Sequence, residues 1–219
     1  MTMLKRIAKL AGITLALALL VAGPGWAGSV YVEPGPTAAY LSGTTEITFS
    51  GADNTSMSSI TGGGLTVSFS SNMLVENVPT GWMTWGAPPQ TEGASPVTLW
   101  TNGPSTMTLT LATAEETFGF ELEPDVFGVD PVSATFYNGA TVLDTISLNV
   151  NGNGGALLFG LASSTPITSV TISDGNFDDF AIAAVRFAPT EVAPEPASML
   201  LLGTSLGGLA LRKLRRKRS

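Results

Sequence analysis

The stretch Thr106-Met107-Thr108-Leu109-Thr110-Leu111 alternates polar and apolar residues without interruption. A period of two places every second side chain on the same face, which is typical of a strand with one buried face. The pattern returns at 117–122, where Phe118, Phe120 and Leu122 are the apolar members, and Pro124 ends it. The two segments therefore predict β-strands.

The alternation continues on both sides of this stretch. Val132, Ala134 and Phe136 lead to Asn138-Gly139, a dipeptide typical of hairpins because both residues tolerate the positive φ of a type I′ turn. The return strand is predicted at 141–150, where Asp144 on the apolar face indicates a bulge or an edge position. Further strands are predicted at 44–50, 65–70, 97–100, 156–161, 167–172 and 180–187.

No apolar segment between the two ends of the chain has a helical period, and turns recur at intervals of roughly ten residues. Many short strands of this kind predict an all-β fold, an antiparallel β-sandwich resembling a jelly roll, for residues 28–189.

The composition excludes several kinds of site. The 219 residues include no Cys and no His, so a cysteine nucleophile, a Ser-His-Asp triad, a His-liganded zinc site and a haem with His or Cys ligands are excluded. All seventeen acidic residues lie between Glu33 and Glu195, a stretch whose one basic residue is Arg186. Such an acidic body repels phosphate groups, so no nucleic-acid partner is expected.

Residues 1–27 have the three parts of a signal peptide. Basic residues at positions 5, 6 and 9 precede an apolar run at 10–22, and Gly23-Pro24-Gly25 then breaks the helix. Gly25 and Ala27 provide the small side chains that signal peptidase accepts on either side of Trp26. The apolar run is shorter than the roughly 20 residues that cross a bilayer. Cleavage after Ala27 is therefore favoured over a permanent N-terminal anchor.

The C-terminus, residues 190–219, has a linker, Pro194-Glu195-Pro196, an apolar segment at 197–211 and a basic tail at 212–218. A basic cluster after an apolar helix stays on the cytoplasmic side, which predicts a single transmembrane helix with the body outside. The apolar segment gives roughly 22 Å of helix, which is marginal for a bilayer core of about 30 Å. The basic residues of the tail are Arg212, Lys213, Arg215, Arg216, Lys217 and Arg218.

These C-terminal features together resemble the PEP-CTERM sorting signal of Gram-negative bacteria. The resemblance implies that an exosortase-type processing enzyme recognises Pro194, Glu195 and Pro196. It also implies that the inner membrane holds the chain transiently before the body reaches the cell surface or the medium, in organisms that make extracellular polysaccharide. An ordinary single-pass C-terminal anchor remains the alternative.

The second half of the body also resembles, more loosely, the lectin-like or carbohydrate-binding jelly-roll domains found among PEP-CTERM proteins. Phe118-Gly119-Phe120-Glu121-Leu122, Phe159-Gly160-Leu161 and the closing segment 180–187 carry this resemblance. The family's last strand usually has an acidic residue or Asn after the Ile, whereas this chain has Ile182-Ala183-Ala184-Val185. An ion or ligand site at those positions is therefore in doubt.

Two loops contain candidate ligand-binding residues. Trp82 and Trp85, with Trp100 and Tyr137 as extensions, could stack on sugar rings, or else cover an open end of the sandwich. Oxygen ligands in the loop 174–179 make it a candidate calcium site, although Asp and Asn are equally common in solvated turns. Its candidate ligands are Asp174, Asn176, Asp178 and Asp179.

Six acidic residues lie close together between 115 and 130. Glu121 and Glu123 fall on the outward face of one predicted strand, about 7 Å apart, a spacing that suits glycoside hydrolysis but follows from strand periodicity alone. Solubility is the simpler explanation, so no catalytic residue is assigned. The six residues are Glu115, Glu116, Glu121, Glu123, Asp125 and Asp130.

The sequence therefore predicts an exported surface or extracellular-matrix protein with a non-catalytic structural or binding role linked to exopolysaccharide. The alternatives are a carbohydrate-binding module that uses the aromatic loop, and a glycan-active enzyme with paired carboxylates. No cofactor is expected, apart from calcium at the 174–179 loop.

Overall fold

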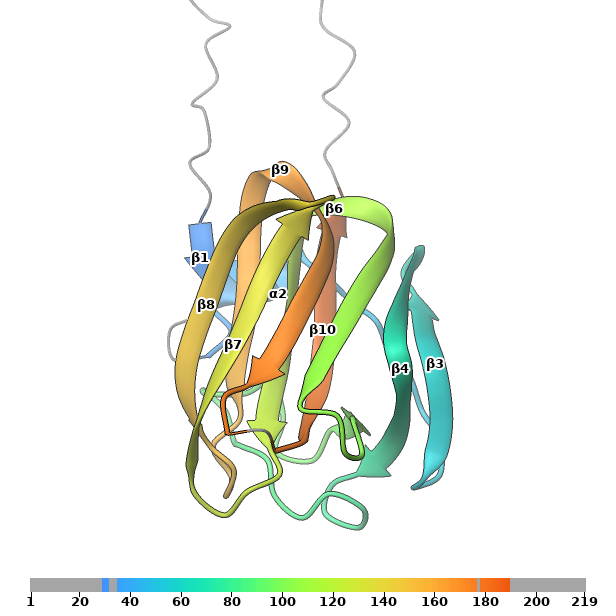
Figure 1. Cartoon of the computed structure of the whole chain (residues 1–219), viewed down its shortest axis with the longest axis vertical. Coiled ribbons are helices and arrows are strands. Elements are labelled where there is room, and N and C mark those ends of the chain that lie inside the picture. Colours follow the sequence, from blue (N-terminus) through green and yellow to red (C-terminus); the bar gives the residue numbers. More distant parts are fainter. Residues whose placement is uncertain (1–28, 32–34, 177, 190–219) are drawn as a thin grey trace, which may run out of the picture.

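Two long strands organise the computed structural model, which describes residues 29–31, 35–176 and 178–189. β6 (Thr106–Pro124) and β9 (Leu157–Asp174) pair along most of their length, with register shifts between Thr110 and Thr117 of β6. The sequence predicted each as two separate strands. Each is instead one continuous strand that curves over the end of the molecule, so that its two halves belong to different layers (Figure 1).

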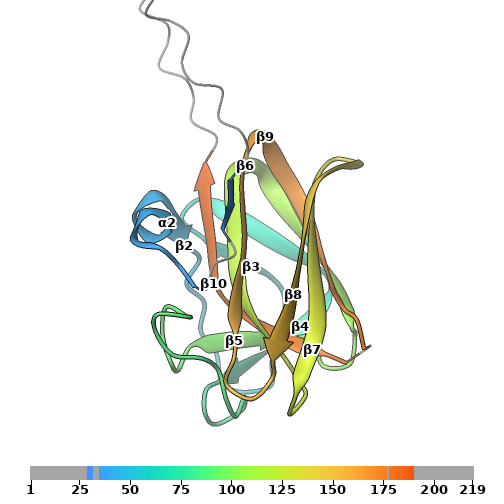
Figure 2. The same ribbon diagram turned by 90° about the vertical axis from the view of Figure 1, so that its left-hand side faces the viewer.

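The described strands form two antiparallel layers (Figure 2), which confirms the predicted β-sandwich. The first layer contains β3 (Thr55–Gly62), β4 (Leu65–Asn77), the first half of β6, the second half of β9, β7 (Val129–Asn138) and β8 (Thr141–Asn151). The second layer contains β1 (Ser29–Tyr31), the first half of β9, the second half of β6, β10 (Phe180–Pro189) and β2 (Thr45–Glu46). β5 (Val97–Trp100) pairs with both β4 and β10, and so joins the two layers along one side.

The core lies between the layers and contains the apolar residues that the alternation predicted. Phe120 stacks on Phe159 with ring centroids 6.0 Å apart, and Phe118 lies 6.3 Å from Phe120. Burying such aromatic side chains provides most of the stabilisation in a domain that has no disulfide. Other core members are Leu109, Leu111, Leu122, Val132, Ala134, Phe136, Ile146, Ile172, Ile182 and Phe187.

The predicted hairpin between β7 and β8 is confirmed, but its turn lies one residue later than predicted. Asn138 pairs with Thr141, so the two-residue loop is Gly139-Ala140. Gly139 has φ 57°, whereas Asn138 is not among the residues with positive φ. The prediction of a type I′ turn centred on Asn138-Gly139 was therefore wrong. Asp144 lies on the edge strand β8 beside a register shift, as predicted.

Three elements escaped the sequence patterns, and one of them is the three-residue strand β1. β3 consists mainly of small polar residues, so its alternation is weak. The short helix α2 (Ala38–Gly43) is capped by Thr37, whose Oγ1 accepts a hydrogen bond from the Tyr40 amide at 3.2 Å. Of the predicted strand 44–50, only Thr45–Glu46 pairs as a strand.

The predicted signal helix, the C-terminal transmembrane helix and the sorting residues lie outside the described residues. Within the described ranges, no helix is long and apolar enough to cross a membrane.

Candidate functional site

The connection between β4 and β5, residues 78–96, covers the outer face of the second layer. Trp82 and Trp85 lie under this connection and are 7% and 2% exposed. Their indoles pack against three alanines of the sheet and its border, where small side chains leave room for large rings. Two of these, Ala183 and its neighbour Ala181, belong to the closing strand β10. The small side chain of Ala183 thus provides a packing surface for tryptophan.

Below the tryptophans, Glu121 and Glu123 of β6 anchor the connection. Glu121 Oε2 accepts a hydrogen bond from Trp85 Nε1 at 3.0 Å, and its Oε1 accepts one from the Glu92 amide at 2.6 Å. Glu123 Oε2 accepts from Trp82 Nε1 at 3.1 Å. Its Oε1 accepts from the hydroxyl of Thr84 at 2.9 Å and the amide of Gly154 at 2.6 Å.

These two carboxylates face outward from the sheet, as predicted, but they are buried rather than solvated. The prediction failed because strand periodicity gives the face of a residue and not what covers that face. Burial raises the pKa of Glu121 to about 7, against the opposing effect of its hydrogen bonds, and burial also raises the pKa of Glu123. All four oxygens accept hydrogen bonds from the chain, so the pair holds the covering segment in place.

At one end of this cover lies a pocket of about 190 Å³, here called the end pocket. Trp82 and Trp100 meet there with ring centroids 6.4 Å apart and planes inclined at 56°. Met83 and Phe127 flank the opening and are 70% and 74% exposed. The end pocket is lined by Gly81, Trp82, Met83, Thr84, Trp100, Asp125, Val126, Phe127 and Gly152.

Two side chains that carry polar atoms belong to the lining of the end pocket. Trp100 contributes its aromatic ring, and its Nε1 is buried and has no hydrogen-bond partner among the described residues. Asp125 provides exposed carboxylate oxygens beside Asp179. Aromatic surface combined with a few donors and acceptors suits a ligand that has both apolar C–H faces and hydroxyl groups.

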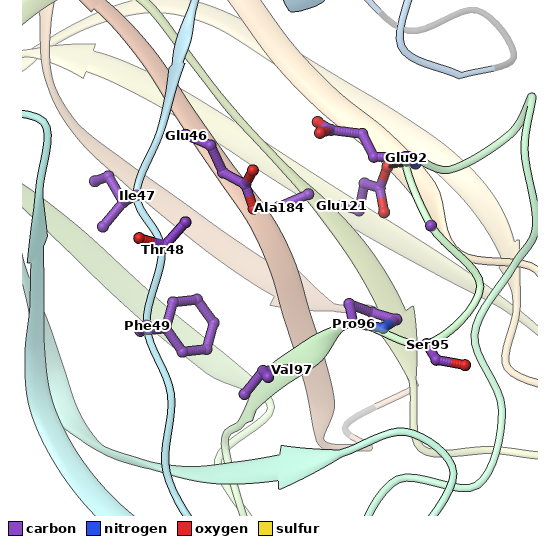
Figure 3. A pocket seen from close by; sticks show the side chains of 11 residues that line it. Glu46, Ile47, Thr48, Phe49, Glu92, Ser95, Pro96, Val97, Glu121 and Ala184 are labelled. Atoms are coloured by element: carbon purple, nitrogen blue, oxygen red, sulfur yellow. Dashed lines mark hydrogen bonds between the residues drawn. The ribbon is translucent and has the colours of Figure 1, made fainter.

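A second pocket, of about 340 Å³, is here called the acid pocket. Figure 3 shows the carboxylates of Glu46, Glu92 and Glu121 on one side, with Phe49 and Val97 across from them.

The carboxylates of the acid pocket are largely occupied. Arg186 Nε and Nη2 donate to Glu92 at 2.6 and 2.7 Å, and Nη2 lies 3.6 Å from Glu46. Glu121 is held by Trp85 and by the Glu92 amide. This ion network fixes the cover to β10 and leaves few free polar groups for a ligand.

The candidate calcium ligands separate into two groups. Asp174 and Asp178 lie together with Asp130, and Asn176 belongs to the same group because its side-chain amide donates to Asp130. Asp179 accepts a hydrogen bond from the Gly103 amide at 2.8 Å, away from the other three. The sequence did not link Asp130 to this loop, although the pairing of Val132 with Asp174 brings the ends of β7 and β9 together.

The structure brings Trp82 and Trp100 together, and excludes Tyr137 from the residues that line the end pocket. Phe127 was missed. It lies in the turn after Pro124, where a large apolar residue without a strand partner is itself an indication of a binding surface.

The comparison with family models matches residues 192–217 to the PEP-CTERM protein-sorting motif. The chain carries a PEP-CTERM sorting motif. It is therefore an exported protein, and the match includes Pro194-Glu195-Pro196 and most of the basic tail. The comparison with curated proteins finds no match.

Several solved carbohydrate-binding modules are similar to the chain. One is the family 11 module from Clostridium thermocellum in complex with a beta-1,3-1,4-mixed-linked tetrasaccharide, at 12% identity and TM-score 0.33, covering 68% of this chain and 96% of that one. Another is a family 29 module from Piromyces equi, at 10% identity and TM-score 0.26, covering 79% of this chain and 97% of that one.

Proposed function

We propose that this exosortase-sorted protein binds a polysaccharide through the end pocket and has no catalytic role of its own. The observation that carries the proposal is the meeting of Trp82 and Trp100 in a pocket whose opening is flanked by exposed Phe127 and Met83. Exposed apolar side chains gathered at a pocket are typical of a binding surface. The Asp125 carboxylate would accept hydrogen bonds from sugar hydroxyls.

The charge of the body favours a neutral polymer. Apart from Arg186, whose guanidinium is bound to Glu92, no basic residue lies between Glu33 and Glu195. A uronate or sulfate group near the end pocket would meet Asp125 and the surrounding acidic surface without a cation to pair with. We therefore propose neutral exopolysaccharide as the ligand class.

Affinity electrophoresis of the mature protein in gels that contain neutral, acidic or amino-sugar polysaccharides tests this proposal. We expect retardation in at least one neutral polymer, and a loss of affinity of roughly fivefold in Phe127→Ala, because stacking on one aromatic ring contributes about 1 kcal/mol. Val142→Ala is the matched control, because Val142 is a 55% exposed apolar residue on β8.

Equal retardation of the Phe127→Ala and Val142→Ala variants would contradict the proposed site. Loss of binding in Phe49→Ala with full binding in Phe127→Ala would move the site to the acid pocket.

The sorting motif makes a separate prediction about the mature chain. We expect the protein recovered from its own cells to lack residues 1–27 and to end near Pro194–Pro196. Intact-mass measurement of the surface, medium and inner-membrane fractions checks this. Replacing Pro194 and Pro196 by alanine should leave the basic tail attached and hold the protein in the inner membrane. A wild-type mass that still includes Arg212–Ser219, found in the inner membrane, would show an ordinary anchor instead.

A further inference from the structure

Three aspartates form a cluster where β7 begins and β9 ends. Asp130 lies at the start of β7, Asp174 is the last residue of β9, and Asp178 belongs to the connection from β9 to β10. One carboxylate oxygen from each lies within 4.8 Å of the others. Antiparallel pairing of β7 with β9 produces this arrangement, because Val132 pairs directly with Asp174.

Two of these carboxylates are buried and incompletely hydrogen bonded. Asp130 and Asp174 are 1% and 2% exposed, and Oδ2 of each is buried without a hydrogen-bond partner. Their other oxygens do have partners: Asp174 Oδ1 accepts from the Asn176 amide at 2.9 Å, and Asp130 Oδ1 accepts from the Asn176 side chain. No donor group of the described residues reaches the second oxygen of either carboxylate.

No side-chain cation compensates these charges. Arg186 is the one basic residue between Glu33 and Glu195, and it is bound to Glu92. Buried carboxylates of this kind are normally paired or coordinate a metal.

We propose that Asp130, Asp174 and Asp178 bind one calcium ion. Calcium takes oxygen ligands at about 2.3–2.6 Å, so two ligands of one ion lie at most about 5 Å apart, which agrees with the cluster. Carboxylates without His or Cys favour a hard cation over zinc or copper. Asp178 is only half-buried, which leaves a side of the site open to water ligands.

The ion would connect three segments at this corner: the start of β7, the end of β9 and the connection to β10. An exported protein meets calcium at millimolar concentrations, where sites with dissociation constants of about 0.1–1 mM are filled. None of the three aspartates lines the end pocket, so calcium binding here does not require a bound sugar.

Thermal unfolding of the mature protein after chelation, with and without 10 mM CaCl₂, tests the site. We expect calcium to raise the midpoint by about 3–10 °C, and MgCl₂ to raise it less. In Asp178→Asn the calcium affinity measured by calorimetric titration should fall by roughly tenfold or more. Glu116→Gln, which removes one charge elsewhere on the body, should leave both values unchanged.

For Asp130→Asn, the difference in stability from the wild type should change sign when calcium is added, which a purely structural role of Asp130 would not produce. Without calcium, this variant should be at least as stable as the wild type, because one buried charge is removed. With calcium it should be the less stable protein. Equal destabilisation of Asp130→Asn in both conditions, or a calcium shift that is the same in the wild type and in Asp178→Asn, would overturn the proposal.

Discussion

Arg186→Met is expected to lower the free energy of unfolding by about 3–5 kcal/mol, because it removes one partner of a largely buried ion pair. The guanidinium donates to both oxygens of Glu92 and also lies 3.6 Å from Glu46. It further donates to the carbonyl of Thr44 at 3.3 Å. One side chain on β10 therefore holds the covering segment, the end of α2 and strand β2, and its loss leaves the partly buried Glu92 carboxylate without its cation.

Urea denaturation at pH 7 measures this effect. Arg186→Lys should recover part of the stability, because lysine keeps the charge but loses the two-bond geometry. The double variant Arg186→Met/Glu92→Met should be more stable than Arg186→Met alone, since it also removes the carboxylate that Arg186 pairs with through two hydrogen bonds. A loss below about 1 kcal/mol in Arg186→Met would show that the network is too solvated to support this account.

Trp85→Phe is expected to destabilise the protein by about 1.5–3 kcal/mol at pH 8.5, and by less at pH 5. Phenylalanine keeps most of the ring but removes the N–H that donates to Glu121 Oε2 at 3.0 Å. Since the folded pKa of Glu121 is about 7, against an ordinary value of 4.5, the stability due to its protonated form is complete below pH 4.5 and is lost as the pH rises through 7.

In Trp85→Phe the pKa of Glu121 should rise further, because the hydrogen bond from Trp85 lowers it in the wild type. The nearby charges of Glu92 and Glu46, which raise this pKa, remain in the variant. The cost should therefore grow across the range above pH 7. Trp100→Phe is the matched control, because its indole Nε1 has no partner to lose. The same loss in both variants, or a loss in Trp85→Phe that does not change with pH, would assign the effect to ring volume.

Strand periodicity predicted most of the sandwich because one face of each strand is apolar. Phe118, Phe120 and Leu122 fill the core as their alternation indicated. The same rule could not show that 106–111 and 117–122 form one strand, since the register shifts between Thr110 and Thr117 reset the alternation. β3 was missed because Thr and Ser supply most of its side chains.

The candidate sites depended on contacts that no local pattern contains. Trp82 and Trp85 stand close in sequence, yet only Trp82 lines the end pocket, because Trp85 lies over Ala183 and Glu121. Trp100 reaches Trp82 through the pairing of β5 with β4 and β10. Asp130 joins Asp174 through the pairing of β7 with β9, from more than forty residues away in the sequence.

The central claim is that the end pocket binds polysaccharide, and the indole N–H resonances of the mature protein test it most directly. With residues 1–27 removed, Trp82, Trp85 and Trp100 are the three indoles that remain. On titration with fragments of a neutral polymer that retards the protein, we expect the Trp100 Nε1–H signal to move most, because Trp100 lines the end pocket and no hydrogen bond holds its Nε1. The Trp85 signal should stay in place, because Glu121 already accepts from it. Saturable binding that leaves the Trp100 signal unchanged would contradict the claim.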